Sequence, residues 1–292
     1  MTKLLTFTSD FGSRDPYVSE VKGVIHACDP DIRIIDITHW IEPGNLTAAS
    51  FVLLHSSGYF VRGAVHLAVI DPGVGSSRDI LAVRTSRYVF IGPDNGILFE
   101  AVKADGGGRI YALEVDRFLQ KLEALYRGNE VIERIAKQGP SSTFHGRDLF
   151  APLAGYILGV EGNGDMPSSD KILERLEEVA HLKDFMVPFE IMHPSGTESR
   201  VSGKVVYIDR FGNIISNIAA GLMSQEDEIF LKTQKSMTLV GTLKRSYSMV
   251  GEGVPLALIG SRGLLEIAVN GGSAKDYFEA GYGDDILVLK KV

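Results

Sequence analysis

The sequence predicts an α/β protein, with a mostly parallel sheet in its N-terminal domain and a smaller antiparallel β-barrel as its C-terminal domain. In the first third of the chain, apolar runs typical of strands alternate with segments of helical periodicity. That order favours parallel strands with helices on both faces of the sheet. Further along the chain, short β-like runs are broken by turn residues. We therefore expect two domains, 1–187 and 188–292.

The N-terminal part contains apolar runs with the length and composition of strands. They are residues 4–8, 32–37, 65–70, 81–85 and 88–91. Segments 17–28 and 46–54 separate the first three runs and carry apolar residues at helical spacing. Open α/β sheets bind ligands at the carboxyl ends of their strands, so the polar turns 9–15 and 71–79 are expected to border a site.

The C-terminal part begins after a stretch rich in glycine, proline and charge, 161–188, which predicts a linker or domain boundary. The β-like runs that follow are 201–206, 214–218, 228–231, 237–239, 255–259, 264–269 and 286–289. Turn residues between such short runs are typical of a small barrel or sandwich.

Composition excludes several classes of protein. The chain has 292 residues, of which 45% are hydrophobic and 23% charged, as in an ordinary globular protein. Its net charge of −7 disfavours nucleic acid and anionic membranes as partners, so a small neutral or cationic substrate is expected. Cys28 is the only cysteine, which excludes an intramolecular disulfide and fits the cytoplasm. No apolar run reaches the roughly 20 residues that a membrane-spanning helix needs.

A carboxylate and a guanidinium occur in one turn after the third apolar run. In VIDPGVGSSRD, 69–79, Asp71 ends the strand and the flexible turn can return Arg78 to the same pocket. An exposed loop ion pair is the alternative, since such pairs are common and weak. The GVG is not a dinucleotide fingerprint, because that requires three glycines opening a helix.

His145 is the best placed of the seven histidines. It lies among polar and glycine residues in SSTFHGRDLFAP, 141–152, just before an apolar helical pattern. His55 and His66 lie instead in apolar patterns that indicate structural imidazoles. The alternative for His145 is a histidine that binds backbone groups where the helix begins.

Two strand–turn–strand segments in the C-terminal part also carry polar groups. They are DRFGNIISN, 209–217, and LIGSRGLLEIAVN, 258–270. The first offers the carboxylate of Asp209, the ring of Phe211 and the amide of Asn213, although Asp, Gly and Asn are also ordinary turn residues.

Together with TSDFG, 8–12, and FIGPDNG, 90–96, these four segments resemble the S-adenosylmethionine hydroxide adenosyltransferase family, which is related to the fluorinase and chlorinase. The resemblance reaches both ends of the chain. It implies hydrolysis of S-adenosyl-L-methionine to adenosine and L-methionine, without a metal or redox cofactor. It also implies a homotrimer, in which the ligand lies between one subunit's first domain and a neighbour's second.

The resemblance implies a role for individual residues. Asp71, Arg78 and His145 match the catalytic triad. Asp10 matches the acidic residue at the ribose hydroxyls, and the segment with Asp209 matches the one that grips the methionine ammonium and adenine. Ser261 and Arg262 match the segment at the methionine carboxylate and base. Glu266 and Val269 are further candidates for the adenine edge. The residues expected at the substrate are Asp10, Phe11, Asp209, Phe211, Asn213, Ser261, Arg262, Glu266 and Val269.

The chemical difficulty lies in the nucleophile, because the sulfonium is already a good leaving group. Bulk water has a pKa of about 15.7 and an ordinary aspartate about 3.9, so Asp71 alone is a poor base. A cationic Arg78 and a cationic His145 are expected to stabilise the developing hydroxide. Asp71 is expected to orient the water and receive its proton.

Two other functions stay open. In a halogenase, fluoride or chloride would replace water, but the resemblance implies that halogenases lack the histidine matching His145 and carry a hydroxyl residue where this chain has Gly146. The second is a non-catalytic adenosine or S-adenosylmethionine binding protein. Segment 117–138 is an additional amphipathic helix relative to the family pattern, and Trp40 fits either base stacking or ordinary packing.

Overall fold

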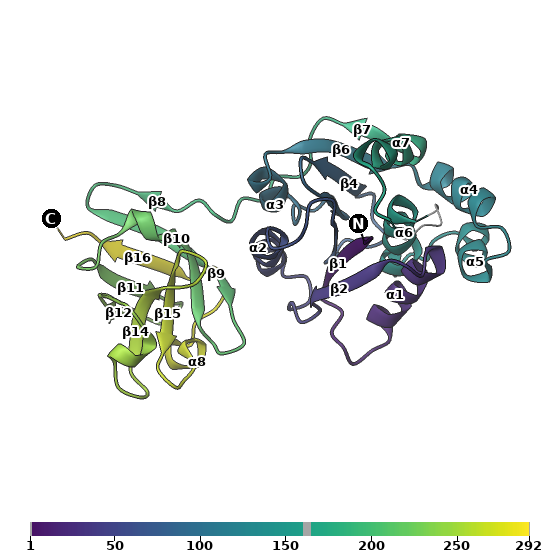
Figure 1. Ribbon diagram of the computed structural model, residues 1–292. Helices are drawn as coiled ribbons and strands as arrows, with labels where there is room; N and C mark the ends of the chain where they lie inside the picture. The colour runs from purple at the N-terminus through teal and green to yellow at the C-terminus, as the bar shows by residue number, and fades with distance from the viewer. Residues whose placement is uncertain (1, 160–164, 292) are drawn as a thin grey trace. The chain divides into compact units, whose positions relative to one another are not determined.

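The computed structural model describes residues 2–159 and 165–291, and the chain divides into two compact units, Met1–Phe189 and Glu190–Val292 (Figure 1). The first unit is mixed α/β and the second consists mainly of antiparallel strands. Both features confirm the predicted fold class. The assignment of independent domains to 1–187 and 188–292 stays a prediction.

The first unit is built on a seven-stranded sheet with the order β2-β1-β3-β5-β4-β6-β7. Neighbouring strands from β2 to β5 are parallel, whereas β4, β6 and β7 continue the sheet in antiparallel fashion. The strands are β1 (Leu4–Ser9), β2 (Arg33–Thr38), β3 (Val65–Val69), β4 (Ile80–Thr85), β5 (Val89–Pro93), β6 (Gly108–Leu113) and β7 (Ala180–Lys183). Strands β3 and β5 are buried along their whole length, as expected for strands covered on both faces.

Helices cover both faces of this sheet, with α2 and α3 on one side and α1, α4, α5, α6 and α7 on the other (Figure 1). They are α1 (Tyr17–Cys28), α2 (Leu46–Ser57), α3 (Phe99–Ala104), α4 (Val115–Leu125), α5 (Glu130–Gln138), α6 (Ala151–Leu158) and α7 (Ser169–Val179). A single π-helical turn, η1 (Gly146–Phe150), precedes α6. Segment 117–138 forms two helices, the larger part of α4 and all of α5, where the sequence predicted one. Phe118, Leu122, Ile132 and Ile135 enter the core.

The stretch 161–188 is not simply a linker. Residues 161–164 lie outside the described residues, but the rest includes α7 and strand β7, which pairs with β6 in the first sheet. Ser168 caps α7, and Ile172, Leu176 and Val179 bury one face of it. This spacing of apolar residues outweighs the polar composition on which the linker prediction was based.

The second unit is a nine-stranded sheet that curls nearly into a barrel, with the order β12-β11-β16-β9-β10-β15-β14-β13 and β8 beside β9. All its pairs are antiparallel except β13 with β14. The strands are β8 (Ser195–Gly196), β9 (Arg200–Ile208), β10 (Ile214–Ala219), β11 (Glu228–Lys232), β12 (Met237–Gly241), β13 (Leu243–Lys244), β14 (Pro255–Ile259), β15 (Leu264–Val269) and β16 (Asp285–Leu289). Short helices η2 (Ala220–Leu222), η3 (Tyr247–Met249) and α8 (Ala274–Phe278) connect them.

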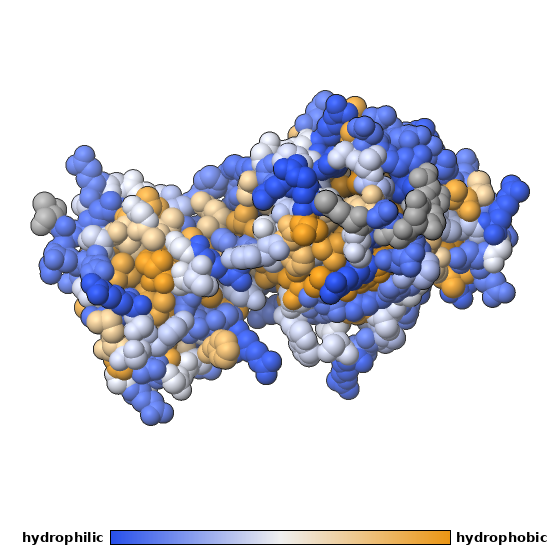
Figure 2. Space-filling view, in the orientation of Figure 1, coloured by the Kyte–Doolittle hydropathy of each residue, from blue (hydrophilic) through white to orange (hydrophobic). Residues whose placement is uncertain are grey.

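The visible surface of each unit is largely hydrophilic, with apolar side chains reaching it in places (Figure 2). Large exposed apolar side chains include Trp40, Phe185 and Phe211. Among the described residues, no helix combines the length and the apolar character needed to cross a bilayer.

His66 is a structural imidazole, as the sequence indicates. It is 1% exposed on β3, shares a hydrogen bond of 2.8 Å with Thr6 Oγ1, and stacks on the Phe90 ring. Burial lowers its pKa from 6.5 to about 4, against a small opposing effect of Asp105. His66 is therefore neutral in the folded protein at neutral pH.

We predict that His66 makes the protein sensitive to acid. Its folded pKa is below the unfolded value, so its stabilising contribution is complete above about pH 6.5 and is lost as pH falls toward 4. Between pH 7 and 4.5 the loss should be on the order of 2–3 kcal/mol. Denaturant unfolding of wild type and His66→Gln at both pH values tests this, and an equal pH dependence in the two proteins would contradict it.

Candidate functional site

A cavity of about 330 Å³ lies at the carboxyl ends of β1 and β3, where the sequence predicts a ligand. Asp10 follows β1, Asp71 follows β3, and His145 comes from the loop before η1. The lining residues are Asp10, Phe11, Pro43, Gly44, Val69, Asp71, Pro72, Val74, Thr143, Phe144, His145 and Gly146. Four of the predicted site residues therefore surround one cavity.

Arg78 joins Asp71 to His145 beside this cavity. Its Nε donates to Asp71 Oδ1 at 2.8 Å, and its Nη2 donates both to Asp71 Oδ2 and, at 2.9 Å, to His145 Nδ1. The side chains of Arg78 and Asp71 are only 9% and 6% exposed. This buried, bidentate ion pair differs from the exposed loop ion pair that the sequence left as an alternative.

A close contact between two loops brings these groups together. Gly75 has a φ of +79°, and a Cβ there would lie 2.5 Å from the carbonyl oxygen of Ser142. Any other residue at position 75 would force apart the loops that carry Arg78 and His145.

The FIGPDNG segment holds the backbone next to Asp71 and the residue next to Arg78 in place, a role that the sequence did not reveal. Asn95 Nδ2 donates to the carbonyl of Ile70 at 2.8 Å, immediately before Asp71. Lys183 Nζ lies 2.5 Å from Asp79 Oδ2 and 2.6 Å from Asp94 Oδ2. Lys183 therefore links Asp79, the residue after Arg78, to Asp94 of this segment. The sequence signal for this role was a carboxylate and an amide, Asp94 and Asn95, directly after the buried strand β5.

The geometry corrects the expected charge of His145. A guanidinium can only donate, so the Nδ1 that receives its hydrogen bond must be unprotonated. Burial, and then the charge of Arg78, lower the pKa of His145, although Asp71 and Asp148 oppose this. At neutral pH, His145 is therefore a neutral imidazole with its proton on Nε2, not the expected cation.

Asp10 and Phe11 form another wall of the cavity. Asp10 Oδ2 accepts from the Gly44 N–H at 2.8 Å. Burial raises the pKa of Asp10, the hydrogen bond from Gly44 opposes this, and the nearby charge of Asp71 adds to the rise. A Cβ at Gly146 would meet the rings of Phe11 and Phe144 at 3.1 and 3.2 Å, so a larger residue there needs those rings to move.

In the second unit, Asp209 holds a tight turn. Its Oδ1 accepts from the backbone N–H groups of Phe211 and Asn213 at 2.9 Å, and its Oδ2 accepts from Asn213 Nδ2 at 2.9 Å. Asn213 is buried, whereas the Phe211 ring is 76% exposed. The aromatic face is thus available to a ligand, while Asn213 organises the turn.

The last predicted positions lie on or beside β15. Ser261 and Arg262 lie in the exposed turn before that strand. Glu266 is buried and accepts a short hydrogen bond from Tyr247. Its pKa is raised by burial and by Asp209, against the hydrogen bond from Tyr247. The Val269 side chain packs in the core of the second unit, so only its backbone remains for a ligand.

Comparison with known proteins links both units to one family. The description "SAM hydroxide adenosyltransferase N-terminal domain" matches residues 5–163, and the corresponding C-terminal domain matches 203–287. Proteins named (R)-S-adenosyl-L-methionine hydrolase are similar over most of the chain. The Thermus thermophilus protein is 34% identical over 92% of this chain and 93% of its own length, and the Salinispora tropica protein is 31% identical over 98% of each.

More distant and structural relatives agree with this. A fluorinase from Nocardia brasiliensis is 25% identical over 92% of this chain and 91% of its own. A crystal structure of an uncharacterized conserved protein from Thermotoga maritima has a TM-score of 0.78 and 30% identity, covering 98% of this chain and 100% of that one.

We predict that nitrogen NMR will find His145 neutral at pH 7, with Nε2 protonated and Nδ1 accepting from Arg78. Its titration midpoint should be below 6.5, because burial and Arg78 disfavour the cation. Arg78→Met should raise that midpoint, and His145→Gln assigns the signal. A protonated Nδ1 in wild type at pH 7 would contradict the geometry.

Proposed function

The chain belongs to the SAM hydroxide adenosyltransferase family, and from this we propose that it hydrolyses S-adenosyl-L-methionine to adenosine and L-methionine. The observation that carries the proposal is the Asp71–Arg78–His145 cluster beside the cavity that Asp10 also lines. Because relatives of this chain are named (R)-S-adenosyl-L-methionine hydrolase, we propose the R form of S-adenosyl-L-methionine as its substrate.

In the proposed reaction, water attacks the ribose 5′ carbon from the side opposite sulfur. A carbon–oxygen bond forms, the carbon–sulfur bond breaks, and its electron pair stays on sulfur to give the neutral thioether of methionine. Adenosine keeps the new 5′ oxygen, and one proton is released. Because the sulfonium of the substrate departs as a neutral thioether, the step needs no general acid, metal or redox cofactor.

The cluster lowers the cost of using water as the nucleophile. With Nδ1 occupied by Arg78, the His145 Nε2–H is the donor left for the water oxygen. Together with the positive charge of Arg78, this donor favours the developing hydroxide. The carboxylate of Asp71 accepts the proton, while Arg78 holds both partners in place. Positioning the oxygen in line with the breaking bond contributes several further kcal/mol.

Substrate binding is shared among polar and aromatic groups in this proposal. Asp10 accepts hydrogen bonds from the ribose hydroxyls, and Phe11 borders the sugar. In the second unit, Asp209 carries the charge for the methionine ammonium, and the exposed Phe211 ring offers a face to the adenine.

The other positions on the second unit serve the two ends of the substrate. Arg262 and Ser261 bind the methionine carboxylate. Glu266, supported by Tyr247, accepts from the adenine amino group, and the Val269 backbone adds a contact at the base edge.

Assembly and location remain part of the proposal. We propose a homotrimer with sites at subunit interfaces, which sedimentation analysis tests, because the family resemblance implies it. We also propose a cytoplasmic location, because the single cysteine suits a reducing compartment.

We predict that purified protein incubated with S-adenosyl-L-methionine in heavy-oxygen water yields adenosine labelled at its 5′ oxygen. The label enters there because water attacks carbon, and mass spectrometry detects it. Reactions with added chloride or fluoride serve as controls. A 5′-halogenated adenosine would instead identify a halogenase, and binding without turnover would identify a binding protein.

We predict that Asp71→Ala, Arg78→Ala and His145→Ala each lower turnover about 100-fold or more, because each removes part of the hydroxide-stabilising cluster. Circular dichroism checks that the variants fold. His181→Ala, which removes an imidazole with a 58% exposed side chain, is the control and should keep wild-type turnover. Near-normal turnover in all three cluster variants would exclude these roles.

A further inference from the structure

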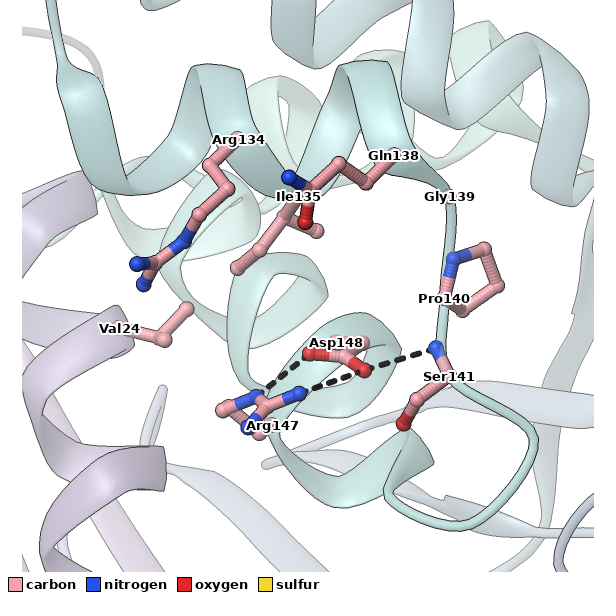
Figure 3. Close-up of a pocket in the computed structure, with 9 residues that line it drawn as sticks. All are labelled: Val24, Arg134, Ile135, Gln138, Gly139, Pro140, Ser141, Arg147 and Asp148. Carbon is pink, nitrogen blue, oxygen red and sulfur yellow. Dashed lines mark hydrogen bonds and ion pairs between the residues drawn. The ribbon is translucent and has the colours of Figure 1, made fainter.

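A buried carboxylate, Asp148, ends the loop that carries His145. Its side chain is 4% exposed and accepts three hydrogen bonds (Figure 3). Arg147 donates from Nε to Oδ1 at 2.7 Å and from Nη2 to Oδ2 at 3.1 Å, and the backbone N–H of Ser141 donates to Oδ2 at 2.9 Å. Although burial opposes ionisation, these bonds hold the pKa of Asp148 below its usual range.

These contacts close the loop 141–148 on itself. The bond between Ser141 and Asp148 joins its two ends. Inside the loop, Phe144 N–H donates to Ser141 Oγ at 3.1 Å, and the Phe144 carbonyl accepts from the N–H groups of Arg147 and Asp148 at 3.2 Å. His145 lies within this closed loop, one residue before the π-helical turn η1.

Arg147 connects the loop to helix α1. Its Nη1 donates to Glu20 Oε2 at 3.0 Å, and its guanidinium lies over the Phe144 ring, 5.1 Å from the ring centroid. Arg147 therefore bonds to Asp148 on one side and to an α1 carboxylate on the other. Through this connection, helix α1 helps to hold the loop in position.

Hydrogen bonds matter here because a cavity borders the loop next to Asp148, although the Phe144 ring packs on Phe11 and Tyr17. A cavity of about 500 Å³ opens between α1, α5 and the loop, and Ser141, Arg147 and Asp148 form one wall of it (Figure 3). The side chains of Arg134 and Gln138 of α5 lie across this cavity from Asp148. Polar contacts, rather than packing against α5, thus restrain this side of the loop.

We propose that Asp148 is a positioning residue for His145, one that keeps Nδ1 against Arg78 and Nε2–H toward the reacting water. The proposal rests on the proposed hydrolysis. Asp148 does not line the cavity next to Asp10 and Asp71, so it acts through the loop and not on the substrate.

The test is Asp148→Asn. The amide oxygen can still accept from Ser141, but the charge that binds Arg147 is lost. We expect kcat to fall about 10- to 100-fold, as for a small misplacement of a reacting group, with KM within about twofold of wild type. In nitrogen NMR without substrate, the two ring nitrogens of His145 should shift toward a mixture of tautomers, because Nδ1 is no longer held against Arg78.

Asp105→Asn is the matched control. The Asp105 side chain is also 4% exposed and pairs with one arginine, Arg87, together with the hydroxyl of Thr85. It lies after α3 and contacts none of the residues of the cluster. The control variant should lose stability similarly, while kcat and the tautomer of His145 stay as in wild type.

Equal effects of the two substitutions on kcat, or a wild-type His145 tautomer in Asp148→Asn, would overturn the proposal. If Asp148→Asn does not fold, Arg147→Lys replaces it, since it keeps a cation beside Asp148 but loses the paired bonds. The same fall in kcat is then expected, and wild-type kcat would overturn the proposal. If wild type does not hydrolyse S-adenosyl-L-methionine, the proposed function fails, whereas the NMR comparison still tests the positioning of His145.

Discussion

The guanidinium of Arg78 is the interaction on which the site depends. It neutralises the buried carboxylate of Asp71 and fixes the protonation of His145 through one nitrogen, Nη2, which contacts both. Asp71 and His145 each bond to Arg78, which links them. Because an unpaired buried charge is costly, the cluster behaves as a unit, and the effects of losing its members should not add.

The surrounding structure places this guanidinium through polar contacts and through the buried Phe150 ring, whose centroid lies 5.5 Å from it. Asn95 fixes the strand end before Asp71, and Lys183 fixes the residue after Arg78. Gly75 lets the two loops meet at backbone distance. A site built this way is specified by the geometry of a few hydrogen bonds, which is what in-line attack requires.

Local sequence patterns predicted the strands and helices that border the site but missed α3 and β6. They singled out Asp71, Arg78 and His145 separately, and the family resemblance grouped them. Apolar periodicity reports burial directly, and residues after parallel strands meet at one edge of a sheet. The tautomer of His145 and the supporting role of Asp148 could not be predicted, because they depend on which atoms face each other across distant segments. The linker prediction for 161–188 also missed strand β7, because its pairing with β6 depends on a distant segment.

All members of the cluster belong to Met1–Phe189, and Asp209 and Glu266 belong to Glu190–Val292. This division has a consequence during synthesis on the ribosome. At about 5–20 residues per second, the roughly 100 residues of the second unit emerge over some 5–20 s after the first. Since domains generally fold as units from the N-terminus, the first unit can bury its charges in that interval. A nascent chain would then hold an assembled water-activating cluster before the groups proposed to grip methionine and adenine have been made.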